Sequence, residues 1–107
     1  MKLPKVVSDL ITAQANFDST AYAACFSETA VVFDEGKTYQ GRQEIEYWIR
    51  NANEQFRTVM TPLSFEEKGT LSILKAAISG TFDGSPIQLN YHFELVEGRI
   101  QSLKITG

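Results

Sequence analysis

The sequence is poor in cysteine and histidine, and each shortage argues against a kind of site. Its single cysteine, Cys25, has no partner for a disulfide within the chain. Cys25 shares an apolar helical face with Ala21, Tyr22 and Phe26, which indicates a buried, inert thiol rather than a nucleophile. The single histidine, His92, has no second His or Cys at ligand spacing, so we expect no metal site. No motif indicates a cofactor.

Long apolar runs and clusters of basic residues are also missing. No run approaches the roughly 20 apolar residues of a membrane-spanning helix, and the first nine residues lack the apolar segment of a secretion signal. We therefore expect a cytoplasmic protein without a membrane partner. The ten Lys and Arg residues are scattered and the formal net charge is −3, so no basic stripe exists to bind nucleic acid.

What the chain does contain is enough apolar material for one folded domain. Its 107 residues are expected to form a single domain over residues 1–107, with one hydrophobic core. The 11% of aromatic residues is sufficient to line a small cavity inside that core.

Three helices are predicted in the first half of the chain. Apolar periodicity indicates a helix from about Lys5 to Asn16, and Asp18 is placed to cap a second helix from Ser19 to about Phe26. A third helix begins at Gly41 and has the clearest apolar stripe, formed by Ile45, Trp48, Ile49, Ala52 and Phe56.

Strands are predicted before and after the third helix. A short apolar strand, Ala30 to Phe33, ends on the carboxylate of Asp34. After Phe56 the hydrophobic period changes to two, which predicts four strands near residues 58–68, 70–81, 86–96 and 100–106. The predicted fold class is therefore α+β, with a curved antiparallel or mixed sheet whose inner face is covered by the three helices.

Turn signals predict how the last strands pair. A two-residue turn at Asp83-Gly84 would place Tyr91 opposite Ala76 and Phe93 opposite Leu74 on the apolar face. The same register places His92 opposite Lys75.

The last hairpin allows two registers, depending on the length of its loop. A two-residue turn at Glu97-Gly98 would put Lys104 on the apolar face, whereas a three-residue loop puts Leu103 beside Phe93. We predict the longer loop. It leaves four side chains on the outer face of the sheet, with Lys104 beside His92: Ile100, Ser102, Lys104 and Thr106.

The order of these signals resembles the nuclear transport factor 2-like superfamily, in particular its SnoaL-like polyketide cyclases and ketosteroid isomerases. The resemblance implies a cone in which the concave sheet, the helices and a hairpin over residues 30–39 enclose a largely apolar cavity. It rests on the segments Phe17 to Asp34, Tyr39 to Trp48, Gly80 to Gly84, Leu89 to Leu95 and Gly98 to Ile105.

The resemblance also implies candidate catalytic residues. Asp34 falls where ketosteroid isomerases carry the general base, and Tyr91 aligns with the oxyanion-hole acid. Leu10 replaces the family's helical tyrosine, which argues against true steroid isomerase activity. The alternative interpretation is that Asp34 only forms a turn with Glu35 and Gly36, and that Tyr91 is an ordinary core residue.

The expected cavity lining is mainly aromatic, with one small residue that leaves room for a ligand: Tyr22, Phe33, Tyr39, Trp48, Phe56, Ala76 and Phe93. The leading hypothesis is a protein that binds a hydrophobic small molecule, with isomerase or cyclase activity by proton transfer as its catalytic form. The rival hypothesis is a non-catalytic dimerisation or protein-interaction module with a vestigial pocket. A homodimer through the mixed polar and apolar outer sheet face is expected.

Overall fold

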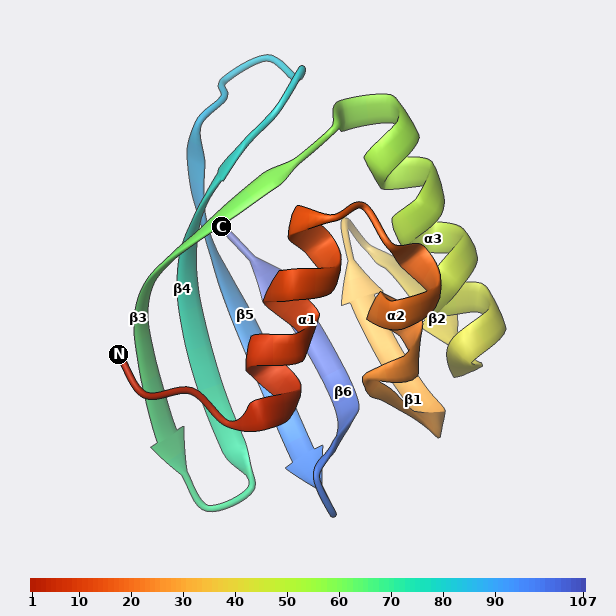
Figure 1. The fold of residues 1–107 in the computed structure, drawn as a ribbon, viewed down its shortest axis with the longest axis vertical. Coiled ribbons are helices and arrows are strands. Elements are labelled where there is room, and N and C mark those ends of the chain that lie inside the picture. Colours follow the sequence, from red (N-terminus) through yellow and green to blue (C-terminus); the bar gives the residue numbers. More distant parts are fainter.

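The computed structural model describes residues 1–107, and in it three helices cover one face of a curved six-stranded sheet (Figure 1). The elements in chain order are α1 (Lys5–Ala15), α2 (Ser19–Ala24), β1 (Phe26–Asp34), β2 (Lys37–Gln40), α3 (Gly41–Phe56), β3 (Val59–Lys68), β4 (Leu71–Ser79), β5 (Ile87–Val96) and β6 (Arg99–Thr106). The α+β class predicted from the sequence is confirmed.

The sheet is mixed, with the strand order β2-β1-β6-β5-β4-β3. Only β1 and β6 run parallel, and this pairing places the first and last strands of the chain side by side inside the sheet, where neither is an edge strand. In Figure 1, α1 and α2 lie over the concave face and α3 runs beside α2 over β1 and β2. None of the three helices has the length and apolar content that a membrane crossing needs.

Local signals explain where the helices begin and end. Asp18 caps α2 as predicted, because its Oδ1 accepts a 3.0 Å hydrogen bond from the backbone N–H of Ala21. Gly41 opens α3 with φ of +82°, a left-handed conformation that suits glycine. The helix predicted to reach Phe26 is shorter, since α2 ends at Ala24 and Phe26 joins β1, where it pairs with Ile100.

The apolar stripe of α3 contributes side chains both to the hydrophobic core and to the wall of a cavity. Ile45 and Ile49 are buried in the core, whereas Trp48, Ala52 and Phe56 are only half-buried. Trp48, Ala52 and Phe56 line a cavity and keep part of their surface exposed there, whereas Ile49 borders the same cavity but is only 5% exposed.

The predicted register between β4 and β5 is wrong by two residues. Leu74, not Ala76, lies opposite Tyr91, and Phe93 lies opposite Ser72. Because the error is an even number of residues, every side chain keeps the predicted face. Lys75 consequently lies opposite Asn90 rather than His92.

The register changes because residues 80–86 leave the strand ladder and bind the end of α3. The backbone N–H of Thr81 donates to the carbonyl of Phe56 at 2.8 Å, and Phe82 packs edge-on against the Phe56 ring at 6.1 Å. The Gly80 N–H donates to Ser85 Oγ at 2.9 Å within this loop. A two-residue turn at Asp83-Gly84 could not make these contacts.

The register predicted between β5 and β6 is confirmed, but it arises differently. Phe93 pairs with Leu103 as predicted. The predicted three-residue loop is wrong, because Val96 pairs with Arg99 across a two-residue turn. A bulge after Glu94 takes up the extra residue. The bulge also turns Ile100 inward, so the prediction that Ile100 lies on the outer face is wrong: its exposure is 0%.

The core lies between α1, α2 and the inner sheet face, and its largest fully buried side chains include Tyr22, Phe26 and Phe93. Cys25 is buried at its edge, where desolvation raises the thiol pKa to about 11. The thiol is therefore protonated at neutral pH, in agreement with the inert role predicted for it.

Candidate functional site

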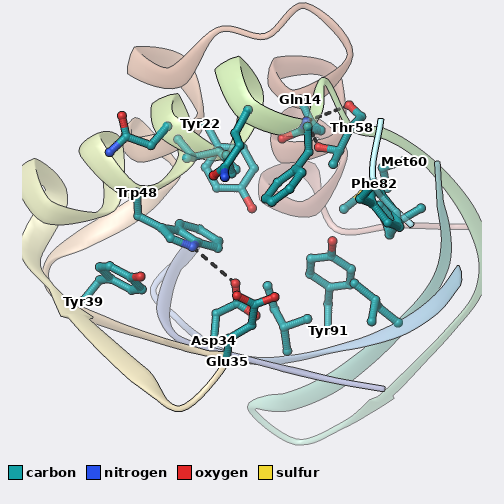
Figure 2. Close-up of a pocket in the computed structure, with 18 of the residues that line it drawn as sticks. Gln14, Tyr22, Asp34, Glu35, Tyr39, Trp48, Thr58, Met60, Phe82 and Tyr91 are labelled. Atoms are coloured by element: carbon teal, nitrogen blue, oxygen red, sulfur yellow. Dashed lines mark hydrogen bonds between the residues drawn. The ribbon is translucent and has the colours of Figure 1, made fainter. Parts of the chain in front are cut away.

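A cavity of about 800 Å³ lies between α3 and the open end of the sheet (Figure 2). Its volume falls within the roughly 300–1,000 Å³ of small-molecule sites. Most of its lining is apolar and comes from α3, the inner sheet face and the loop after β4, including Ile49, Ala52, Phe56, Met60, Ile78, Phe82, Leu89 and Ile105. A few polar side chains interrupt this wall, and they determine what the cavity can do.

Asp34 reaches the cavity from the last position of β1. Asp34 pairs with Lys37 across a two-residue turn whose residues, Glu35 and Gly36, both have left-handed φ angles of +51° and +75°. Asp34 therefore ends a turn and also lines the cavity, so the two interpretations drawn from the sequence are compatible. Trp48 Nε1 donates a 3.3 Å hydrogen bond to Asp34 Oδ2 and leaves Oδ1 without a side-chain donor.

The environment raises the pKa of Asp34 above its ordinary value. Desolvation is the largest cause, and the negative charge of Glu35 adds to it. Hydrogen bonds from the Trp48 indole and the backbone N–H of Glu35 act in the opposite direction but are smaller effects. A desolvated carboxylate with a raised pKa is a stronger base than one in water, as proton abstraction requires.

The raised pKa of Asp34 predicts how its contribution to stability depends on pH. Since the folded pKa exceeds the unfolded value of about 3.9, this contribution is fully present below the unfolded pKa and is lost as pH rises through the folded pKa. We expect Asp34→Asn to gain stability relative to the parent over this window. Urea unfolding at several pH values measures the difference, and NMR of the carboxyl carbon measures the pKa directly. A folded pKa at or below about 3.9 would contradict the prediction.

Two tyrosine hydroxyls point into the same space as Asp34 (Figure 2). Tyr91 comes from β5 and Tyr22 from α2; they are 6% and 2% exposed, and neither hydroxyl has a hydrogen-bond partner within the protein. Burial raises the pKa of Tyr22 and of Tyr91 well above the ordinary tyrosine value, and the nearby Asp34 charge adds to both shifts. Both phenols therefore keep their protons and can donate to a ligand oxygen.

The structure places four of the seven expected lining residues on the cavity: Tyr22, Tyr39, Trp48 and Phe56. The Trp48 indole lies between the two tyrosines and packs against both. Its ring centroid is 5.7 Å from that of Tyr39 and 6.1 Å from that of Tyr22. Together these rings form an aromatic wall beside Asp34.

The other three expected residues do not line the cavity. Phe33 is 42% exposed on the outer face, because successive strand residues alternate and Asp34 faces inward. Ala76 and Phe93 do face inward but are completely covered, at 0% and 1% exposure. They belong to the packed core, and the space expected beside Ala76 is filled.

Sequence reasoning missed two polar residues of the cavity, Gln14 and Thr58. Gln14 is 3% exposed on the inner face of α1. A signal for it was available, because Gln14 continues the apolar stripe of Val7 and Leu10 at helical spacing. Thr58 carried no comparable signal. No three His, Cys, Asp or Glu side chains are placed to hold a metal ion.

No protein-family model matches the sequence. No curated protein matches it either. The solved structures do: a candidate polyketide cyclase from Sinorhizobium meliloti is 36% identical, with 97% of this chain and 95% of that chain covered and a TM-score of 0.93.

Two more distant structures share the fold. A hypothetical protein with a ketosteroid isomerase-like fold from Catenulispora acidiphila is 18% identical over 99% of this chain and 87% of its own, with a TM-score of 0.89. A nuclear transport factor 2-like protein of unknown function from Cytophaga hutchinsonii is 16% identical over 99% and 90% of the two chains, with a TM-score of 0.80.

Proposed function

Because the chain belongs to the SnoaL-like group of the nuclear transport factor 2-like superfamily, we propose that it binds a hydrophobic carbonyl compound in its cavity and acts on it by proton transfer. The observation that supports this proposal is the convergence of one desolvated carboxylate, Asp34, and two phenols, Tyr22 and Tyr91, on a mainly apolar cavity. The S. meliloti relative, described as a candidate polyketide cyclase, supports a substrate with carbonyl groups.

In the proposed reaction Asp34 is the general base. Its carboxylate takes a proton from the carbon next to the ligand carbonyl, and the electron pair of that C–H bond forms an enolate. The enolate oxygen accepts hydrogen bonds from the protonated Tyr91 and Tyr22, which stabilise its negative charge. Two phenol donors thus replace the carboxylic acid that the resemblance places at the oxyanion hole.

The fate of the enolate decides the product. In an isomerisation, protonated Asp34 returns the proton to a different carbon of the ligand. In a cyclisation, the enolate carbon bonds to a second carbonyl carbon of the same molecule, and the oxygen of that carbonyl receives the proton. Both routes regenerate the carboxylate. Leu10, completely buried in the core, cannot donate to a steroid ketone, so steroid isomerisation is not the reaction that we propose.

The cavity also bears on the rival hypothesis of a non-catalytic module. A vestigial pocket would be filled by side chains, whereas this one retains about 800 Å³ lined by Asp34, Tyr91 and Trp48. This favours binding or catalysis over the module.

A thermal-shift screen against hydrophobic ketones tests binding. A ligand at roughly 100 times its Kd should add about 2.7 kcal/mol to the free energy of unfolding of the parent protein. Asp34→Asn should still bind, because its amide oxygen can accept from Trp48, whereas Tyr91→Phe should bind carbonyl ligands more weakly. Glu54→Gln, an exposed change outside the cavity on α3, is the matched control. If no ketone shifts the parent protein, the binding proposal fails.

We also propose a homodimer through the outer face of the sheet. This face carries exposed apolar side chains, with Phe33 42%, Leu71 59% and Ile73 40% exposed, among polar neighbours such as His92 and Asn90. Such a mixture is typical of isologous interfaces. Sedimentation equilibrium should give twice the chain mass of 12.0 kDa, and Ile73→Lys should shift the protein toward the monomer. A monomeric parent at high micromolar concentration would refute this assembly.

A further inference from the structure

The cavity has a second polar end that the proposed proton transfer does not use. Figure 2 shows Gln14 and Thr58 on the helix side of the cavity, across from Asp34 and Tyr91 on the sheet side. Gln14 is 3% exposed, so its amide could not be placed there without hydrogen-bond partners.

The amide nitrogen of Gln14 is fully used. Gln14 Nε2 lies 2.9 Å from Asn53 Oδ1, 3.0 Å from the backbone carbonyl oxygen of Thr58 and 2.9 Å from Thr58 Oγ1. The carbonyl oxygen of Thr58 can only accept, so the opposite orientation of the Gln14 amide would set two oxygens against each other. The backbone of Thr58 therefore fixes which end of the amide is nitrogen.

This fixed orientation leaves two hydrogen-bonding functions unused. Gln14 Oε1 accepts from no group of the protein, and the hydroxyl of Thr58, which accepts from Gln14, donates to none. Among the polar atoms without a partner, only Ser72 Oγ is completely buried, so the unpartnered Gln14 Oε1 keeps some exposed surface. Both residues line the cavity and touch each other, so its wall contains an unused acceptor and an unused donor on two adjoining side chains.

We infer that Gln14 and Thr58 select ligands that carry a hydroxyl group at the end remote from the reacting carbonyl. A hydroxyl can donate to Gln14 Oε1 and accept from the Thr58 O–H at the same time, whereas a ketone or ether oxygen only accepts and leaves Oε1 unpaired. The inference rests on the proposed function and narrows its ligand class to hydroxylated carbonyl compounds.

The test compares probes that differ by one hydroxyl. Tetralone, a bicyclic aryl ketone, and its derivatives with a single phenolic hydroxyl at each free ring position are titrated by calorimetry. For the derivative whose hydroxyl reaches Gln14, we expect about tenfold tighter binding than for tetralone, which corresponds to one or two net hydrogen bonds. The measured quantity is the ratio of the affinities for the hydroxylated derivative and for tetralone. Partial unfolding of a variant lowers the amount of binding protein for both ligands alike, so it does not change this ratio.

Substitutions at Gln14 and Thr58 test whether these two residues cause the preference for the hydroxylated ligand. Gln14→Met removes the acceptor and should abolish the preference. Should it fail to fold because Asn53 and Thr58 lose their donor, Thr58→Val provides a second test, since it keeps the backbone acceptor of Gln14 and removes only the hydroxyl. Thr58→Val should reduce the ratio and Thr58→Ser should retain it. Gln43→Met, an exposed change on α3, should leave the ratio as in the parent.

The outcomes separate this inference from the proposed function. If tetralone and all its phenolic derivatives bind equally well, the hydroxyl selectivity is wrong and carbonyl binding stands. A preference that persists in both Gln14→Met and Thr58→Val would also overturn the inference, because another part of the cavity would supply it. If no member of the series binds, the proposed function fails and the inference fails with it.

Discussion

Asp34→Asn is expected to slow proton abstraction from a bound ketone by roughly 10²–10⁴-fold, the usual contribution of a positioned general base. An amide keeps the size of the side chain and can still accept the hydrogen bond from Trp48, but it cannot take up a proton. The effect should therefore appear in the chemical step rather than in a loss of stability or of ligand affinity.

The exchange of ligand protons for deuterium measures this step without knowledge of the natural product. A tetralone incubated with the protein in deuterated buffer should exchange the hydrogens next to its carbonyl, and NMR gives the rate. The parent rate should rise with pH through the raised pKa of Asp34 and then level off, because the base acts in its ionised form. Asp34→Asn should lose this pH profile, whereas Glu54→Gln should retain it. Equal exchange by Asp34→Asn and the parent would eliminate Asp34 as the base.

Phe93→Ala is expected to be the most destabilising of the changes considered, at about 3–5 kcal/mol in the free energy of unfolding. Phe93 is 1% exposed, and its ring stacks on that of Tyr91 at 6.4 Å, so the truncation opens a cavity under the sheet-side wall of the site. The expected loss is a large part of the roughly 5–15 kcal/mol that stabilises an ordinary domain. Urea unfolding, or failure to obtain folded protein, would report it.

Phe33→Ala is the matched control for Phe93→Ala. The sequence suggested both phenylalanines as cavity residues, but Phe33 is 42% exposed on the opposite face of the sheet. We expect its truncation to cost about 1 kcal/mol or less. Any contribution of Phe33 to a subunit contact would depend on protein concentration, so the measurement is made at several concentrations. Equal losses for the two variants would mean that the assignment of faces is wrong.

Much of the fold could be read from the sequence because the deciding interactions are local. The cap at Asp18, the start of α3 at Gly41 and the alternation of the later strands depend on residues within a few positions of one another. A register error of two residues leaves every side chain on its predicted face. Tyr91 was therefore correctly predicted on the inner face, although its partner is Leu74 rather than Ala76.

The candidate site could be predicted only in part. Asp34 and Tyr91 were singled out through a family resemblance, but the same reasoning included Phe33, whose strand position next to Asp34 sends it to the other face. Ile100 faces inward because of a bulge between β5 and β6, and the residues of the Glu97-Gly98 turn do not predict that bulge.

By itself, the sequence determined the three helices, the four strands after α3 and the faces of most of their residues, since hydrophobic periodicity and turn chemistry act over short distances along the chain. Only the tertiary structure decided what surrounds the cavity. Phe56 and Thr81 hold the loop after β4 against α3, and Gln14 meets Thr58 across 44 residues of chain. Contacts between such distant residues depend on how whole helices and strands pack against one another. Local sequence patterns do not predict that packing.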